Sequence, residues 1–103
     1  MKLLNISYVP DQEIEALGIV KGGVVQSKHI GRDFMAGMKT LVGGEIKGYT
    51  EMIDEARQIA TKRMVDEAIG LGADAIINVR YASSAVMQGA SEVMVYGTAV
   101  KFK

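Results

Sequence analysis

Residues 49–71 read YTEMIDEARQIATKRMVDEAIGL, and they run directly into Gly72-Ala73-Asp74-Ala75-Ile76-Ile77-Asn78-Val79. In the first stretch apolar residues recur every three or four positions with charged residues between them, which is the pattern of a helix with one buried stripe. The glycines around its end and the apolar run that follows predict that a strand begins there. Together they predict a helix that packs on a sheet. The predicted stripe consists of Tyr49, Met52, Ile53, Ala56, Ala60, Met64, Ala68 and Leu71.

The flanking regions predict further strands. A short strand is expected over residues 2–9, and residues 14–30 are rich in strand-forming residues. Within the latter, Gly22-Gly23 marks either a hairpin turn or a bulge in one long strand, and we favour one bent, continuous strand. Two more strands are expected at residues 75–82 and 92–102, joined by a long turn or lid.

A second, shorter helix is expected between these regions. From Asp33, a candidate N-cap, apolar residues recur at helical spacing until Gly43-Gly44. The chain is thus predicted to be α+β: a bent, mostly antiparallel sheet with two helices packed on it. Because residues 92–102 carry apolar side chains on both faces, and two helices cannot cover both faces of the sheet, we infer a subunit interface.

Composition restricts the function. The 103 residues are enough for one domain, residues 1–103, and 12 basic against 12 acidic residues give no net charge, so we expect no nucleic-acid partner. The absence of cysteine excludes disulfides, thiolate metal sites and cysteine nucleophiles. With no signal-like or membrane-spanning apolar run, we expect a cytoplasmic protein without a membrane partner.

Several short motifs occur together in order over nearly the whole chain. They are Gly18-Ile19-Val20, Arg32-Asp33, Gly43-Gly44, Gly48-Tyr49, Gly72-Ala73-Asp74-Ala75-Ile76 and Gly97-Thr98-Ala99-Val100-Lys101. In this the chain resembles the YbjQ-like family, uncharacterised proteins labelled as heavy-metal-binding. The resemblance implies an α+β subunit that assembles into a ring-like homopentamer, and only the family label implies a metal cofactor.

The chain departs from that family at two places. Members usually carry acidic residues in the strand after the Gly-Ala-Asp motif, whereas this chain reads Asn78-Val79-Arg80-Tyr81 there. Members usually have arginine after the Gly-Gly pair, whereas this chain has Glu45. The first departure weakens a metal site in that strand, and the second changes the charge of the glycine-rich loop.

Candidate metal ligands are few. His29 is the one histidine, and a zinc site needs three or four ligands, so it could bind a metal only if a ring gathered several copies on its axis. The alternative is a surface histidine at a strand end. The seven methionines fall mostly on predicted apolar faces and are interpreted as core residues.

Other candidates point to ligand binding. The loop that contains Gly43 and Gly44 precedes a helix N-terminus, where anions bind; the alternative is a plain connection. Arg32 and Asp33 could contact a neighbouring subunit, or be a solvated arginine and an N-cap. Tyr49 is either a ligand contact or part of the buried stripe. The carboxylates at Asp54, Glu55, Asp66 and Glu67 are read as a solvated face, with Lys62–Asp66 and Arg63–Glu67 pairs.

No catalytic set can be assembled from these residues. The leading hypothesis is a non-enzymatic, homo-oligomeric protein that binds a small molecule or metal at subunit interfaces. A structural ring that binds another protein is the first alternative. An enzyme with an interface site that uses Arg32, Asp33, His29 or Tyr49 is ranked last.

Overall fold

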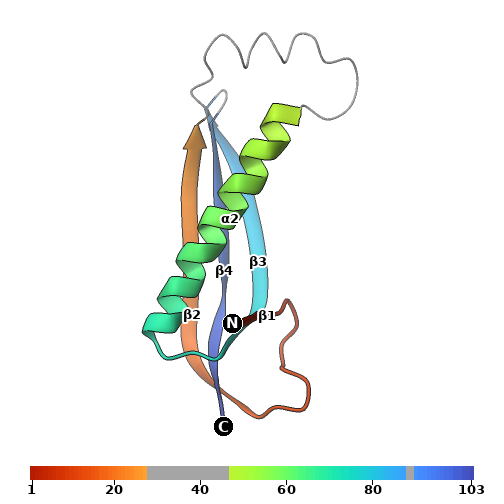
Figure 1. The fold of residues 1–103 in the computed structure, drawn as a ribbon, viewed down its shortest axis with the longest axis vertical. Coiled ribbons are helices and arrows are strands. Elements are labelled where there is room, and N and C mark those ends of the chain that lie inside the picture. Colours follow the sequence, from red (N-terminus) through yellow and green to blue (C-terminus); the bar gives the residue numbers. More distant parts are fainter. Residues whose placement is uncertain (28–46, 88–89) are drawn as a thin grey trace.

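The computed structural model describes residues 1–27, 47–87 and 90–103 of the chain. The elements are β1 (Lys2–Leu3), β2 (Ile14–Ser27), α2 (Lys47–Gly70), β3 (Ala75–Met87) and β4 (Ala90–Phe102). The strands form one sheet in the order β1-β3-β4-β2 (Figure 1). β1 pairs parallel with β3, and the other neighbours are antiparallel, so the sheet is mixed.

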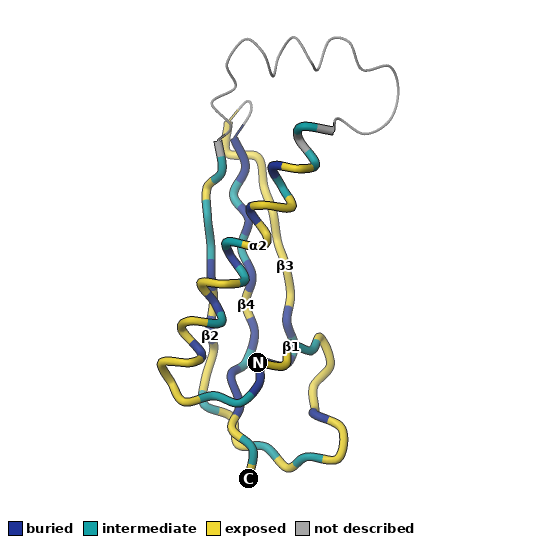
Figure 2. The backbone as a smooth tube through the Cα atoms, viewed as in Figure 1, coloured by how far each residue is buried: buried dark blue, intermediate teal, exposed yellow. Residues whose placement is uncertain are grey.

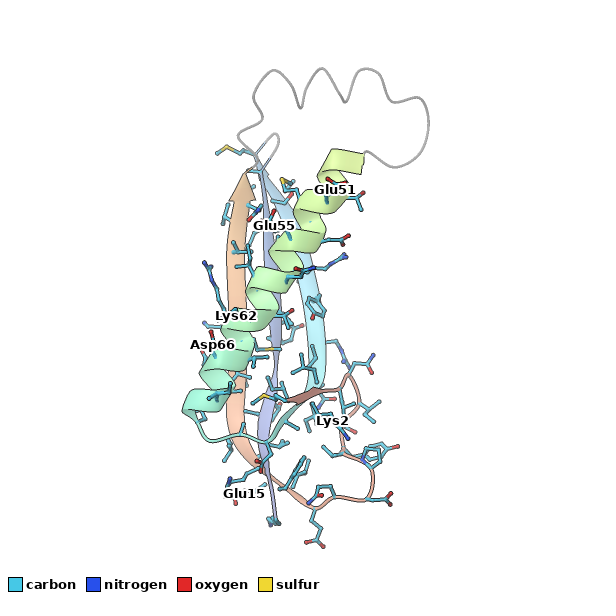
Figure 3. All side chains as sticks on the ribbon, viewed as in Figure 1. Lys2, Glu15, Glu51, Glu55, Lys62 and Asp66 are labelled. Atoms are coloured by element: carbon cyan, nitrogen blue, oxygen red, sulfur yellow. The ribbon has the colours of Figure 1, made fainter. Side chains whose placement is uncertain are left out.

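Helix α2 packs along one face of the sheet, over β2 and β4 (Figure 1). Five residues of the predicted apolar stripe, Met52, Ala56, Ala60, Met64 and Ala68, are fully or almost fully buried. The predicted last member, Leu71, follows the end of α2 and is 50% exposed. Ala56, Ala60, Met64 and Ala68 belong to one core cluster with residues of the sheet, namely Val20, Val79, Val93, Val95 and Ala99. The opposite side of α2 carries charged residues such as Lys62 and Asp66, which pair at 2.9 Å in solvent (Figure 3). Such an exposed pair contributes only about 0.3–0.5 kcal/mol, so the helix is held by its buried side.

A glycine lets the helix approach the sheet closely. A Cβ placed on Gly22 of β2 would collide with the carbonyl oxygen of Ala60 and would lie 2.6 Å from the main-chain nitrogen of Met64. Both contacts are with main-chain atoms, which cannot turn aside as a side chain can. The chain neighbour Gly23 differs, because its Cβ would meet only the Val93 carbonyl oxygen at an ordinary 3.7 Å.

We therefore expect Gly22→Ala to destabilise the fold by about 1–3 kcal/mol, because strand and helix must move apart. Gly23→Ala is the matched control, since it adds the same methyl group without the collision. Urea unfolding followed by circular dichroism measures both. Equal stability of the two variants would show that α2 does not lie this close to β2.

Among the described residues, the N-terminal segment alone covers the other face of the sheet, and only at one end. Val9 is buried there against Ala75, Ile77 and Val100, with Leu4, Ile14 and Phe102 at the margin. Farther along, β3 changes from buried to exposed: residues 80–87 are exposed throughout (Figure 2). Elsewhere on this second face, as far as the structure describes it, Ile19, Val25 and Tyr96 are 78%, 58% and 42% exposed.

Several sequence predictions are confirmed. The long helix predicted at residues 49–71 is α2, and the bent continuous strand is β2, which runs through Gly22-Gly23 without a turn. Its register shift lies earlier, between Ala16 and Gly18. No helix in the described ranges is long and apolar enough to cross a membrane, and a cytoplasmic location stays a prediction.

Other predictions are corrected. A sheet with two packed helices is wrong for the described ranges, where α2 alone packs on a four-stranded mixed sheet; the predicted short helix lies outside the described residues. The predicted first strand, 2–9, is reduced to Lys2–Leu3. The expected loop or lid is mostly strand, because β3 continues to Met87 and β4 begins at Ala90. β3 is longer than its apolar run because main-chain pairing continues into exposed residues such as Ser83, Ser84 and Ala85. β4 begins earlier than predicted because the buried residues Ala90 and Ser91 also pair.

Candidate functional site

Most of the predicted site residues are not described by the structure. His29, Arg32, Asp33, Gly43 and Gly44 lie outside the described residues. Tyr49 belongs to α2, but its side chain is also outside the description. The structure therefore does not test whether these residues come together, and their roles stay predictions.

The described residues bear on the metal hypothesis. Residues 1–27, 47–87 and 90–103 contain no group of three or more histidine or acidic side chains arranged to hold a metal ion. Met52 and Met64 are buried in the core between helix and sheet, as their apolar positions predicted. The acidic residues of α2 are exposed to solvent, and Asp54 pairs with Arg57 at 3.4 Å.

One predicted pair on α2 is wrong. Arg63 and Glu67 do not pair with each other but reach the outer edge of β2. Arg63 Nη1 donates to the Gly23 carbonyl oxygen at 2.6 Å, and the Lys21 main-chain N–H donates to Glu67 Oε1 at 3.3 Å. Sequence spacing alone favoured the pair along the helix; the proximity of the β2 edge provides alternative partners.

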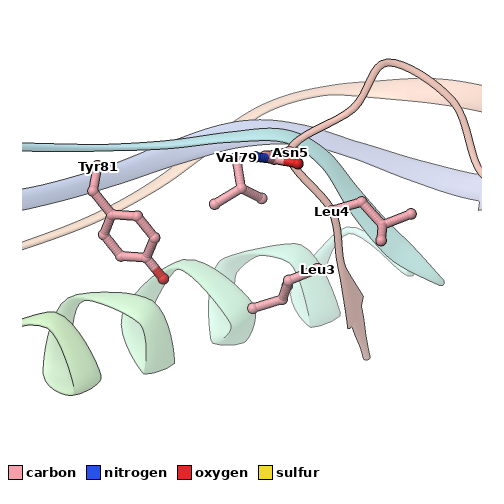
Figure 4. Close-up of a pocket in the computed structure, with 5 residues that line it drawn as sticks. All are labelled: Leu3, Leu4, Asn5, Val79 and Tyr81. Carbon is pink, nitrogen blue, oxygen red and sulfur yellow. The ribbon is translucent and has the colours of Figure 1, made fainter.

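A small pocket lies beside β1, where β3 passes α2. Its volume is about 350 Å³, at the lower end for small-molecule sites, and its lining is Leu3, Leu4, Asn5, Val79 and Tyr81 (Figure 4). The Arg80 Nη1 atom donates to the Asn5 carbonyl oxygen at 2.9 Å and so holds the N-terminal segment at the margin. The lining can enclose a small apolar group, but it offers no acid–base pair.

The Tyr81 hydroxyl links β3 to α2 beside this pocket. It lies 2.9 Å from Thr61 Oγ1, which itself donates to the Arg57 carbonyl oxygen at 2.7 Å. Because the one hydroxyl proton of Thr61 is used in that bond, Tyr81 is the donor.

We expect Tyr81→Phe to lower the free energy of unfolding by about 0.5–1.5 kcal/mol through loss of this bond. In a double-mutant cycle with Thr61→Val, the second substitution should cost less once the first is present. Additive effects of the two substitutions in urea unfolding would show that the bond does not form in solution.

The face of the sheet opposite α2 carries several exposed side chains in the part of the chain that the structure describes, and we call it the open face. Since Val20, Val93 and Val95 point into the core under α2, their sequence neighbours point the other way. Two exposed apolar residues of β2 lie there, Ile19 at 78% and Val25 at 58% exposure. The open face consists of Ile19, Lys21, Gly23 and Val25 of β2, Glu92, Met94, Tyr96 and Thr98 of β4, and Arg80, Ala82 and Ser84 of β3.

One row across the open face combines two cations with an aromatic ring. Tyr96 pairs with Lys21 on one side and with Arg80 on the other, so the three residues lie in one row. At the end of this row the Arg80 Nη1 atom also donates to the carbonyl oxygens of Asn5 and Val79. Tyr96 is 42% exposed, and both cations are exposed. Within the described ranges the Lys21 ammonium group has no hydrogen bond or ion pair. The acidic residue of this face, Glu92, is four positions along β4, about 13 Å away.

This row was not predicted from the sequence. The assignment of Tyr96 to one face of its strand was correct, but its neighbours depend on the register of three strands. That register is shifted by irregularities between Ala16 and Gly18 and between Ile77 and Arg80. Asn78, inside the second irregularity, has a positive φ of 53°, and nothing in its sequence context indicated this.

Comparison with known proteins identifies the family. A family model described as "Putative heavy-metal-binding", the YbjQ model, matches residues 1–103. The chain belongs to the YbjQ family. It is 66% identical over 102 residues to a UPF0145 protein of Alkaliphilus metalliredigens, covering 99% of both chains. It is 62% identical over 101 residues to a UPF0145 protein of Helicobacter hepaticus, covering 98% of this chain and 97% of the relative.

A solved structure supports the fold of this YbjQ-family chain. A DUF74-family protein of unknown function from Pediococcus pentosaceus matches it with a TM-score of 0.64 and 18% identity, over 100% of this chain and 98% of the other. At that identity the match bears on the fold alone. The resemblance read from the sequence motifs is therefore confirmed, whereas the relatives' names state no ligand or reaction.

Proposed function

We propose that this YbjQ-family chain is a non-enzymatic binding protein that works as a homo-oligomer, with its ligand held against the open face at the boundary between subunits. The observation that carries the proposal is the open face itself, on which the exposed apolar residues Ile19 and Val25 accompany a row of Lys21, Tyr96 and Arg80. The pentameric ring implied by the family resemblance is the assembly we expect.

The apolar part of the open face supports association. Full burial of a valine or isoleucine side chain contributes about 1.5–3 kcal/mol, and Ile19 and Val25 are mostly exposed in the single chain. A second copy that covered them would recover this free energy. The absence of net charge adds no repulsion between copies.

The polar part of the open face indicates the class of ligand. Two cations beside an exposed aromatic ring suit a small organic anion with a flat apolar part, because the ring offers stacking and the cations offer ionic hydrogen bonds. The same set repels a metal cation. The family description therefore enters the proposal only as a second candidate, a metal ion on a ring axis that gathers several copies of His29.

Native mass spectrometry of untagged protein, purified without chelator, tests both the proposed homo-oligomer and the proposed bound ligand. We expect multiples of the 11.1 kDa chain, with five copies for the ring, and excess mass from a retained ligand. A monomer at every concentration would contradict the homo-oligomer. Bare oligomers that bind nothing in a broad screen of metabolites and metals would leave the alternative, a ring that binds another protein.

The position of the ligand is tested by a pair of lysine variants. We expect Lys21→Ala to remove the excess mass without changing the number of subunits, because the substitution removes one cation of the row. Lys62→Ala is the matched control, since Lys62 is an exposed lysine on the far side of α2. Loss of excess mass in His29→Ala, with retention in Lys21→Ala, would instead favour the metal candidate.

A further inference from the structure

We propose that the pocket beside β1 is a separate binding site, formed within one chain, for a small uncharged aromatic molecule that carries a hydrogen-bonding group such as a primary amide. The pocket is lined by the N-terminal segment and by β3, and it shares no residue with the row of Lys21, Tyr96 and Arg80. The inference therefore goes beyond the proposed function and does not depend on the association of copies.

An extra residue in β3 directs one wall of the pocket. Ile76 belongs to the core cluster under α2, and Ile77 belongs to the cluster on the opposite face of the sheet. With strict alternation Val79 would share the face of Ile77, yet Val79 packs in the cluster under α2. The phase changes at the irregularity of β3 that contains Asn78, whose φ is positive at 53°. This bulge turns Val79, and two positions later Tyr81, toward α2 (Figure 4).

The position of α2 leaves space in front of this wall. The helix packs mainly on β2 and β4, and none of its residues lines the pocket. The other wall, the N-terminal segment, is fixed to β3 by main-chain bonds. The Leu4 N–H donates to the Ile76 carbonyl oxygen, and the Leu4 carbonyl oxygen accepts from the Val79 N–H, both at 2.9 Å. Walls held in this way need little ordering when a ligand binds.

The lining is apolar at its base and polar at its rim. Val79 is buried, and Leu3 and Leu4 are half-buried, whereas Asn5 and Tyr81 are exposed. The side chains of Leu3 and Tyr81 lie on either side of Val79 (Figure 4). An aromatic ligand on this apolar base gains contact with the Tyr81 ring, because aromatic pairs contribute more than their buried area alone.

The charge of the lining selects against ions. No charged side chain lines the pocket. Arg80 follows Val79 in the sequence, but its Nη1 atom already donates to the main-chain carbonyl oxygens of Asn5 and Val79. An ion that left water for this pocket would lose hydration without gaining a counter-ion. The pocket therefore favours an uncharged molecule, unlike the organic anion that we propose for the open face.

Two polar groups at the rim define the hydrogen bonds that a ligand must make. The Tyr81 hydroxyl group donates its proton to Thr61 Oγ1, so it can only accept from a ligand. The side-chain amide of Asn5 makes no hydrogen bond among the described residues, and it can both donate and accept. A primary amide suits this pair, because its N–H groups donate and its carbonyl oxygen accepts.

Benzamide and benzoate test the site as a matched pair, since they have nearly the same shape and only benzoate is charged. In NMR spectra of the isotope-labelled, unsubstituted protein we expect benzamide to shift the amide signals of residues 3–5 and 79–81, with a Kd of about 1–10 mM for a ligand of this size. Benzoate should bind there at least about tenfold more weakly. Nuclear Overhauser effects from the benzamide ring to the methyl groups of Leu3 and Val79 should place it in the pocket.

Two tyrosine variants separate the pocket from the open face. Tyr81→Ala removes a ring and a hydroxyl group from the pocket and should raise the Kd of benzamide at least about tenfold. Tyr96→Ala is the matched control, because Tyr96 lies on the open face and is 42% exposed, against 49% for Tyr81. It should leave the Kd unchanged. Asn5→Ala, which keeps the carbonyl group that Arg80 holds, should raise the Kd about threefold to tenfold.

The outcomes separate this inference from the proposed function. Unshifted signals at residues 3–5 and 79–81 in millimolar benzamide, equal binding of benzoate there, or an unchanged Kd in Tyr81→Ala would overturn the pocket site. If Tyr81→Ala fails to fold by circular dichroism, Asn5→Ala and the Overhauser effects decide in the same way. Failure to find an open-face ligand that is lost in Lys21→Ala bears on the proposed function alone, because Lys21 does not line the pocket.

Discussion

The close contact between α2 and β2 determines the rest of this structure. Gly22 brings the strand against the main chain of the helix at Ala60 and Met64, and the alanines at 56, 60 and 68 present no bulk that would hold the two apart. Because the helix packs mainly on β2 and β4, it makes little contact with β3. The Tyr81–Thr61 hydrogen bond is one of the few links across that side. The exposed half of β3 is a consequence of this arrangement.

One helix can cover only one face of a sheet, and among the described residues the side chains of Ile19, Val25 and Tyr96 stay exposed on the other face. The principal dimensions, 54 × 24 × 17 Å, are those of a long, thin body, and in the described part of the chain α2 forms one layer on the sheet. The N-terminal segment closes one end of the second face, around Val9 and Val100. The uncovered remainder combines apolar side chains with a cationic and aromatic row. That combination is the basis on which we propose self-association and ligand binding at the subunit boundary.

The sequence predicted the parts that depend on local pattern. The stripe of α2 was readable because apolar residues recur at helical spacing over six turns, and the motifs identified the family. The end of β3 was predicted too early, at residue 82, because residues 83–87 carry no apolar alternation and are held in the strand by pairing with β4. The Arg63–Glu67 pair was wrong because spacing along a helix says nothing of a strand edge nearby. The open face depends on register across two irregularities, which pattern alone does not reveal.

The central claim is that copies of this chain bury the open face of the sheet, and thiol accessibility tests it most directly. Because the chain has no cysteine, Ile19→Cys on the open face and Ile69→Cys on α2 each give one reactive group; the native side chains are 78% and 59% exposed. The account predicts that the thiol at 19 reacts slowly with a maleimide in concentrated protein and fast after dilution, whereas the thiol at 69 reacts fast in both. Equal, fast reaction of both thiols at every concentration, with the fold intact, would contradict it.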